Sequence, residues 1–373
     1  MTRPRVGINL LWLLPEEAGG AEEYAVRLLH ALDDVAGDVI DLTLLCNRRF
    51  PNARPELAER FRVAVAPVGG GSRAARIAAE SAWISIAASR ARLHLVHHLN
   101  NVIPWIRNRP SVVTIHDLRP IALPETLGRT HGAYLRARLR PSARNASVIT
   151  TPSEYVRGTV VDLLGADPDR VHVVSAPILP ITVPVEPATI APPGASVFLY
   201  PAITNRHKNH ATLLEAFARV VAHEPDAFLV LTGAAGEAED DVRRAIAAPA
   251  LAGRVHRAGR VTASELAWWF GAATALVYPS TYEGFGLPLA EAMSAGCPVI
   301  ASDRTALPEV VGDAGILVDA FDVEGWVDAM TRLAADEQLR RRYAKAGRER
   351  AAIWSPAASA RRQIDAYRAA LGG

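Results

Sequence analysis

The feature that most constrains the fold is a regular alternation of short apolar runs with longer amphipathic stretches. Helical patterns at residues 21–32 and 153–164 separate runs that read as buried strands. Such alternation indicates parallel strands joined by crossover helices, so the first half is expected to be a doubly wound α/β domain. The strand-like runs are 6–11, 40–45, 93–97, 112–115, 147–151 and 171–175.

Closely spaced prolines interrupt this alternation between residues 177 and 195, where a stiff, extended connection is expected. The alternation then restarts, with strands expected at 197–200, 228–231, 275–278 and 299–301 and a helix at 210–223. Beyond Phe321 only helical patterns remain, at 323–335, 337–349 and 355–371. The predicted divisions are a first domain over 1–178, a linker over 179–195, a second domain over 196–354 and a terminal helix over 355–373.

Charge and cysteine content narrow the class of protein. The 373 residues include 41 Lys plus Arg and 39 Asp plus Glu, so no polyanion-binding surface and no nucleic-acid partner are expected. Cys46 and Cys297 each lie in an apolar run, which favours packing in a reducing cytoplasm. The apolar run at 6–14 is shorter than a membrane span and precedes a Gly-Gly turn, so at most peripheral membrane contact is expected, at the inner face.

A strand, loop and helix unit at residues 275–295 carries the strongest chemical signal. The loop reads TYEGFG, and Pro288 suits the first turn of the helix that follows. Loop glycines allow close backbone approach, and the amide end of the helix attracts an anion such as a diphosphate without a metal. Glu283 and Glu291 could accept hydrogen bonds at two ends of one elongated ligand, although each could also be a solvated carboxylate.

The stretch 278–318, which begins YPSTYEGFGLPLAEAMSAG, closely resembles the signature of the retaining glycosyltransferase family 4. That resemblance implies the GT-B fold, an α/β architecture of two Rossmann-like domains facing across a cleft, with the terminal helix crossing back to the first domain. It also implies that Glu291 holds the donor ribose and that Glu283 faces the transferred sugar. The backbone amides expected to contact sugar and phosphates are those of Gly284, Phe285, Gly286 and Leu287.

A second segment, YPAITNRHKNH, joins a strand to a helix through a polar loop. Lys208 in this loop matches the family's phosphate-binding lysine, although a loop lysine is more commonly a solvated charge. Many members have an arginine five residues earlier, where this chain has Ile203, so Arg206 is the candidate for a second cation. The HKNH variant is similar to a subgroup rich in mannosyl- and rhamnosyltransferases.

Two candidate positions lie in the first domain. Gly20 follows the first strand, and the resemblance places this loop near the donor phosphate and the acceptor, although a flexible turn would look the same. His116 comes directly after a strand, at the edge where α/β domains bind ligands. It resembles the family's cleft histidine, and sugar positioning is favoured over a general-base role.

Two possible metal-binding patterns are rejected. His97 and His98 point to opposite faces of one strand, so packing at the strand end is favoured over a metal site that also includes His94. The acidic residues at 167 and 169 fit a turn between a helix and a strand. No metal and no cofactor are expected.

The predicted activity is transfer of a hexose, with retention, from a nucleoside diphosphate sugar to a hydroxyl of a glycan, a lipid-linked acceptor or a small metabolite. GDP-mannose is the favoured donor. Catalysis would be electrostatic and would depend on Glu283, Lys208 and His116. The alternatives are a rhamnosyl or glucosyl donor, a nucleotide-sugar epimerase or phosphorylase, and a catalytically silent sugar-binding protein.

Overall fold

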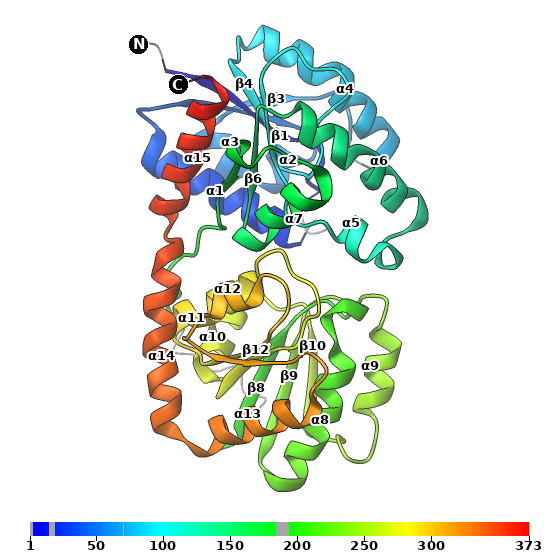
Figure 1. The fold of residues 1–373 in the computed structure, drawn as a ribbon, viewed down its shortest axis with the longest axis vertical. Coiled ribbons are helices and arrows are strands. Elements are labelled where there is room, and N and C mark those ends of the chain that lie inside the picture. Colours follow the sequence, from blue (N-terminus) through cyan, green and yellow to red (C-terminus); the bar gives the residue numbers. More distant parts are fainter. Residues whose placement is uncertain (1–2, 15–18, 70, 184–193, 373) are drawn as a thin grey trace. The chain divides into compact units, whose positions relative to one another are not determined.

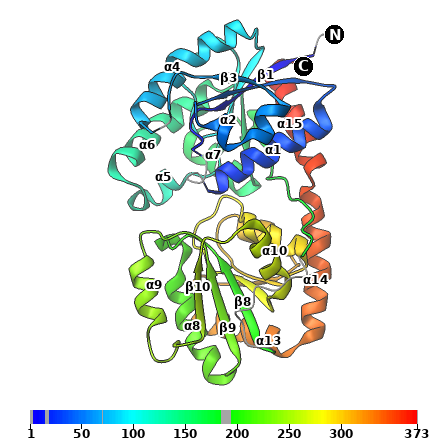
Figure 2. The ribbon, with the colours of Figure 1, turned by 180° about the vertical axis from the view of Figure 1, so that it is seen from behind.

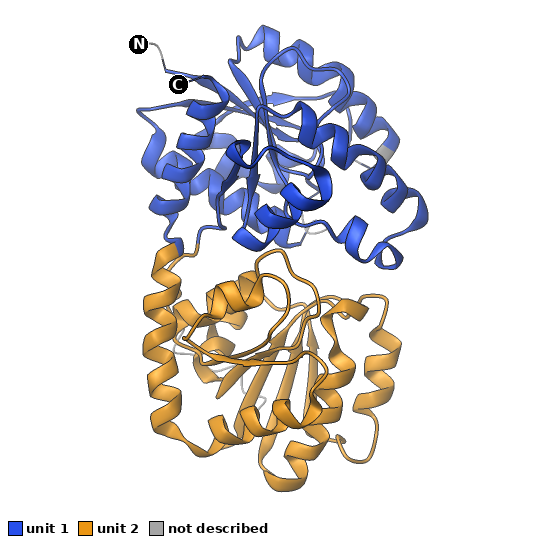
Figure 3. Cartoon of the chain, viewed as in Figure 1, with its two compact units in different colours: residues 1–177, 354–373 blue, residues 178–353 orange. Residues whose placement is uncertain are grey.

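The computed structural model describes residues 3–14, 19–69, 71–183 and 194–372. Contacts divide the chain into two compact units, which Figure 3 distinguishes by colour. Unit 1 comprises residues 1–177 and 354–373, and unit 2 comprises residues 178–353. Most of the segment predicted as a linker, 179–195, lies outside the described residues.

Unit 1 is built on a seven-stranded sheet in the order β3-β2-β1-β4-β5-β6-β7, with all neighbours parallel. Chain order reverses between β1 and β4, so these two strands flank the topological switch point. The strands are β1 (Arg5–Leu10), β2 (Asp41–Cys46), β3 (Arg62–Val65), β4 (Leu95–His98), β5 (Ser111–Thr114), β6 (Val148–Thr151) and β7 (Val171–Val173).

The helices of unit 1 include the last helix of the chain, α15, which lies beside α1 in both views of the fold (Figure 1; Figure 2). Tyr367 of α15 is buried, and its hydroxyl lies 2.9 Å from Nδ1 of His97 in β4. The C-terminal helix therefore completes the core that begins at the N-terminus. The helices are α1 (Gly20–Ala36), α2 (Phe50–Ala53), α3 (Pro55–Arg60), α4 (Arg73–Arg90), α5 (Arg119–Ala122), α6 (Arg129–Asn145), α7 (Glu154–Leu164), α15 (Pro356–Ala370) and the 3-10 turns Pro124–Thr126 and Pro168–Arg170.

Unit 2 contains a six-stranded parallel sheet in the order β10-β9-β8-β11-β12-β13, and its switch point lies between β8 and β11. Its strands are β8 (Ser196–Pro201), β9 (Ala227–Thr232), β10 (Val255–Gly259), β11 (Ala275–Tyr278), β12 (Val299–Ser302) and β13 (Ile316–Val318). Its helices are α8 (His210–His223), α9 (Glu239–Ile246), α10 (Ala263–Ala272), α11 (Leu287–Ala295), α12 (Leu307–Val311), α13 (Val323–Ala335), α14 (Glu337–Ala351) and the 3-10 turn Arg206–Lys208. A further 3-10 turn, Ala352–Trp354, leads into α15.

These two parallel α/β units confirm the fold class predicted from the sequence. The predicted helices 210–223 and 323–335 and the predicted strand 275–278 have the observed bounds. The sequence does not identify the edge strands β3, β10 and β13: β3 and β10 contain an arginine, and β13 is only three residues long. No residue of β3 or β10 is fully buried.

Among the described residues, no helix is both long and apolar enough to cross a membrane.

A close backbone contact fixes the loops that follow β8 and β9. Gly233 has φ +112°, and a Cβ atom there would lie 2.4 Å from the carbonyl oxygen of Ala202. Only glycine combines this conformation with this approach. The contact holds the beginning of the 202–209 loop, which carries Lys208, against the end of β9.

Replacing Gly233 with alanine is therefore expected to destabilise unit 2 by about 3 kcal/mol or more, since backbone must move to relieve the clash. Gly253→Ala is the matched control: its φ is +75°, but no heavy atom lies within 4 Å of the added Cβ. That variant should lose only about 1 kcal/mol. Calorimetric melting of both variants checks this expectation, and equal losses would contradict it.

Candidate functional site

The candidate site in unit 2 is centred on an ion pair at the switch point. Nζ of Lys208, in the loop after β8, lies 2.5 Å from Oε1 of Glu283, in the loop after β11. The two side chains are only 16% and 13% exposed. The structure thus brings together two charged residues that are 75 positions apart in the chain and that the sequence selected independently.

The loop that carries Lys208 is held by hydrogen bonds on several sides. The Tyr200 hydroxyl donates to the Lys208 carbonyl at 2.5 Å and lies 3.2 Å from the Ser280 hydroxyl. Asn209 adopts a left-handed conformation (φ 55°), and its Nδ2 donates to the Ala320 carbonyl at 2.7 Å. The Thr281 amide donates to the His207 carbonyl at 2.8 Å. These bonds join the loops after β8 and β11, so the position of Lys208 relative to Glu283 is fixed by backbone as well as by charge.

The loop that carries Glu283 ends in a glycine turn that starts α11. The Glu283 amide donates to Oγ1 of Thr305 at 3.0 Å. Gly286 has φ +94°, and a Cβ there would meet Leu307 at 2.8 Å, so the turn requires glycine. Leu287 and Pro288 then form the first turn of α11, as the sequence predicted for Pro288. The positive end of this helix faces the carboxyl edge of the sheet, where an anion is stabilised.

Electrostatics favour the charged form of the pair. Burial raises the pKa of the Glu283 carboxyl, but the Lys208 ammonium and its hydrogen bond outweigh burial and hold that pKa below its ordinary value of 4.5. The Lys208 ammonium also lies 5.6 Å from the centre of the Tyr278 ring. At neutral pH the site therefore contains a paired carboxylate and ammonium that are poorly screened by water.

Five further predicted donor residues lie in the same loop and in α11. Glu291, on the second turn of α11, is 8% exposed, which excludes the alternative that it is a solvated surface residue. Phe285 and Gly286 are buried, and Gly284 and Leu287 are half-buried. A carboxylate is rarely buried without a partner, so Glu291 is held within unit 2, and its contact with the donor ribose stays a prediction.

Arg206 lies in a different environment from Lys208. Its side chain is exposed, and its backbone amide donates to Oε1 of Glu237 at 3.2 Å. Arg257 of β10 is a mostly buried cation that the sequence did not indicate, and it lies 3.0 Å from Glu239. Glu239 in turn accepts a hydrogen bond from the Thr204 hydroxyl at 2.7 Å. Arg257 also donates to the Gly233 carbonyl at 2.8 Å. Because Gly233 lies against Ala202, this bond helps to hold the loop that leads to Lys208. The position of Arg257 within a strand gave no signal of this role.

In unit 1, His116 is held in one orientation at the end of β5. Its Nε2 lies 2.9 Å from the Leu99 carbonyl, and its amide donates to Oδ1 of Asn101 at 2.7 Å. A carbonyl only accepts, so Nε2 carries the proton and Nδ1 is an acceptor. Burial lowers the pKa of His116, and the imidazole is neutral at pH 7. The ring can thus accept a hydrogen bond from a hydroxyl group.

Gly20 is the first residue of α1, after Gly19 with φ +59°. Both glycines are exposed, and no described heavy atom lies within 4 Å of a Cβ added at either one. Packing among the described residues therefore does not explain glycine at position 20. The predicted close approach of a ligand there stays a prediction.

The histidines that the sequence considered as metal ligands have other partners. His97 lies 2.8 Å from the Thr114 hydroxyl, and Nδ1 of His98 lies 3.2 Å from Nδ2 of Asn9. Within the described ranges, no three His, Cys, Asp or Glu side chains converge to hold a metal ion. Oδ1 of Asp167 accepts the Asp169 amide at 3.0 Å, which confirms the predicted turn.

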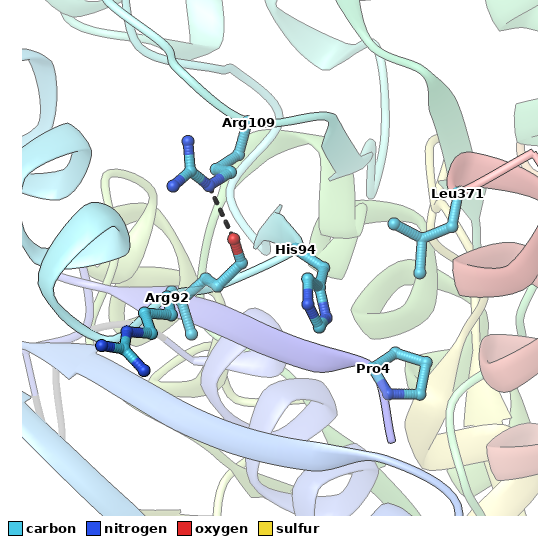
Figure 4. Close-up of a pocket in the computed structure, with 6 residues that line it drawn as sticks. Pro4, Arg92, His94, Arg109 and Leu371 are labelled. Atoms are coloured by element: carbon cyan, nitrogen blue, oxygen red, sulfur yellow. Dashed lines mark hydrogen bonds between the residues drawn. The ribbon is translucent and has the colours of Figure 1, made fainter. Parts of the chain in front are cut away.

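A hollow of about 500 Å³ lies on the opposite edge of the unit 1 sheet, where β1, β4 and β5 begin (Figure 4). Nε of Arg109 donates to the Leu93 carbonyl there at 2.6 Å. None of the predicted site residues lines this hollow. Its lining residues are Pro4, Arg92, Leu93, His94, Arg109 and Leu371.

Comparison with known proteins covers both units. The family described as "Glycosyl transferases group 1" matches residues 187–350, and the family described as "Glycosyltransferase Family 4" matches residues 18–178. The chain is similar to alpha-maltose-1-phosphate synthase of Mycolicibacterium smegmatis, with 32% identity over 69% of this chain and 71% of that protein.

Two further proteins are similar to this one. O-antigen chain mannosyltransferase B of Escherichia coli is 31% identical over 62% of each chain, so the match spans less than two thirds of that relative's length. The solved structure of Anabaena Alr3699/HepE, in complex with UDP and glucose, has a TM-score of 0.76 at 18% identity, covering 97% of this chain and 99% of that one. At this identity the structural likeness establishes the fold alone.

The Lys208–Glu283 pair allows a direct test of how the site is held together. Because removing one partner leaves the other buried and unpaired, Lys208→Met and Glu283→Gln should each destabilise unit 2 by about 2 to 4 kcal/mol. The double variant should be less destabilised than the sum of the two losses. Denaturant unfolding of the three variants measures this coupling, and strictly additive losses would show that the pair contributes none.

The pair also predicts a pH dependence. Because the folded pKa of Glu283 is lowered, its contribution to stability is present above pH 4.5 and is lost as the pH falls through the folded pKa. The difference in melting temperature between wild type and Glu283→Gln should therefore be larger at pH 7 than at pH 3. A difference that grows on acidification would contradict this assignment.

Proposed function

The chain belongs to the family 4 glycosyltransferases with the GT-B fold, and we propose that it transfers a hexose, with retention of configuration, from a nucleoside diphosphate sugar to an acceptor hydroxyl. The observation that carries this proposal is the Lys208–Glu283 pair beside the start of α11. A buried ammonium and a helix N-terminus at one switch point suit a diphosphate, and the adjacent carboxylate suits sugar hydroxyls.

The leaving group determines what the site must do. As the bond between sugar and phosphate breaks, the diphosphate gains negative charge, and Lys208 and the first amides of α11 stabilise that charge. Because these groups are already ordered, little reorganisation is needed in the transition state. The proposal assigns no role to a metal ion or a cofactor, since the protein supplies the positive charge.

The other residues orient the donor. Glu291 accepts hydrogen bonds from the ribose hydroxyls, and Glu283 faces the transferred sugar while remaining close to Lys208. In unit 1, Nδ1 of His116 is proposed to accept a hydrogen bond from a sugar hydroxyl. The acceptor hydroxyl attacks from the side of the leaving group, and a phosphate oxygen takes its proton, so no covalent glycosyl-enzyme forms.

The proposed donor is GDP-mannose. The E. coli relative is named as a mannosyltransferase of O-antigen chains, which supports mannose and a glycan acceptor. UDP and glucose in the solved relative make glucosyl transfer the second candidate, and rhamnosyl transfer is the third.

We place the protein in the cytoplasm, with at most peripheral contact to the inner membrane face.

The experiment that tests transfer measures release of nucleoside diphosphate from GDP-mannose, dTDP-rhamnose and UDP-glucose, with and without a mixture of simple glycosides as acceptors. Release that depends on acceptor supports transfer. Conversion of donor without any release would indicate an epimerase, and donor binding without either reaction would indicate a silent sugar-binding protein.

Variants of Lys208 and Arg206 test which cation stabilises the leaving group. Lys208→Ala is expected to lower kcat/KM by about a hundredfold or more, because it removes charge stabilisation from the leaving group. Arg206→Ala, an exposed cation two residues away, should have less than a threefold effect. Steady-state rates with the preferred donor check both expectations, and full activity in a Lys208→Ala, Glu283→Ala double variant would refute the proposed site.

A further inference from the structure

The hollow at the edge of the unit 1 sheet where β1, β4 and β5 begin has a basic lining. Its basic residues are Arg92, His94 and Arg109 (Figure 4). They belong to two connections, one between α4 and β4 and one that leads into β5. No carboxylate lines the hollow, and among the described residues neither arginine has an ion-pair partner. The positive charge of this surface is therefore not neutralised by the part of the chain that the structure describes.

The turn after α4 holds Arg92 in a conformation that arginine rarely adopts. Its φ of +52° is in the left-handed region. The Leu93 amide donates to the Ala88 carbonyl at 2.9 Å and the Arg92 amide donates to the Ser89 carbonyl at 3.1 Å, so the helix ends in a Schellman motif. Glycine is favoured at this position, because a Cβ is strained there. The turn thus gives no reason for arginine, and the exposed side chain makes no hydrogen bond to a described residue.

Carbonyl groups of the same turn fix two other arginine side chains. Nε of Arg5, at the start of β1, donates to the Arg92 carbonyl at 2.7 Å. Nε of Arg109 donates to the Leu93 carbonyl at 2.6 Å, and its Nη1 donates to the Asn108 carbonyl at 2.7 Å. Both guanidinium groups are therefore ordered before a ligand binds, so binding costs little side-chain entropy.

His94 faces Arg5 with a donor rather than an acceptor. Its Nδ1 accepts the Arg5 amide at 2.9 Å, and a neutral imidazole has only one acceptor nitrogen. Nε2 therefore carries the ring proton, yet it lies 3.4 Å from Nη2 of Arg5, which also can only donate. Two donors that face each other cannot bond, whereas an anion oxygen beside them would accept from both.

We propose that this hollow binds an organic phosphate ester. The phosphate oxygens accept from Nε2 of His94 and Nη2 of Arg5, and the guanidinium groups of Arg92 and Arg109 neutralise the remaining charge. A phosphate monoester carries a charge of about −1.5 to −2 on three terminal oxygens, so it suits this set of donors better than a singly charged carboxylate does. The site is at the opposite edge of the sheet from His116 and is independent of the proposed transferase function.

The apolar part of the hollow indicates that the ligand has an organic part. In Figure 4 the guanidinium groups of Arg92 and Arg109 lie on one side of the His94 ring. Pro4 and Leu371 lie on its other side. The volume of about 500 Å³ is in the range of small-molecule sites and leaves room for a carbon skeleton beside the phosphate. A bound ester would also join Leu371, which follows α15, to the connections before β4 and β5.

The test measures binding by the whole chain. Isothermal titration calorimetry uses glycerol 3-phosphate as a soluble phosphate monoester and acetate as the carboxylate. Co-sedimentation uses vesicles of phosphatidylcholine with and without phosphatidic acid, which carries the same group on a lipid. Either phosphate ester should bind at least about tenfold more tightly than acetate, because it accepts more charge-assisted hydrogen bonds.

Charge reversal shows whether the hollow is the binding site. Arg92→Glu should weaken binding of the ester about tenfold or more, since it replaces an attractive charge with a repulsive one. Arg140→Glu is the matched control, because Arg140 is an exposed arginine on α6 that does not line the hollow. It should weaken binding by less than about twofold.

Arg92→Gly separates a binding role from a structural one. It removes the guanidinium group and also relieves the left-handed turn. Binding should therefore weaken about fivefold to tenfold, while the melting temperature without ligand should be no lower than that of wild type. A lower melting temperature in Arg92→Gly would show that the arginine stabilises the fold and would contradict the inference.

The outcomes identify the source of the ester. Binding of glycerol 3-phosphate that Arg92→Glu weakens and Arg140→Glu does not would support the site with a soluble ligand. Binding only to vesicles that contain phosphatidic acid, with the same response to the two variants, would support the site with a lipid ligand. Absence of binding to both esters, equal losses in the two charge-reversal variants, or acetate binding as tight as that of the ester would each overturn the inference.

Discussion

The arrangement of the loops at the carboxyl edge of the unit 2 sheet depends on the ion pair between Lys208 and Glu283. Two charges that are mostly withdrawn from water must be paired, and their pairing ties the loop after β8 to the loop after β11. The Tyr200 hydroxyl, the left-handed Asn209 and the Thr305 hydroxyl hold the same two loops through the backbone. A site held in this way is ordered before any ligand arrives, which is the condition for electrostatic catalysis.

The sequence predicted every strand in the interior of the two sheets and missed three of the four edge strands, β3, β10 and β13. All six residues of β9 are buried, and its apolar run is evident in the sequence, whereas β10 carries His256 and Arg257 and is nowhere fully buried. In the site, the EGFGLPLAE segment and Lys208 could be recognised from the sequence because each lies within a single short motif. Thr305 and Arg257 could not, because residues far apart in the chain act together only after the sheets form.

The two units use one topology for different chemistry. In unit 2 the switch point carries the Lys208–Glu283 ion pair and the start of α11. In unit 1 it carries the neutral imidazole of His98, the amide of Asn9 and the carboxyl group of Glu80, whose pKa is raised by burial. A parallel sheet sets where a ligand can bind, and the side chains at the strand ends decide which ligand.

The return of α15 to unit 1 has a consequence for the order of folding during synthesis. The first 177 residues leave the ribosome before unit 2, but Tyr367, which bonds to His97 and packs inside unit 1, emerges only after unit 2. Unit 2 is one continuous segment and can fold as soon as it is complete. The N-terminal half therefore has part of its core uncovered until α15 has been synthesised, and during that interval it is the part of the chain most in need of protection by chaperones.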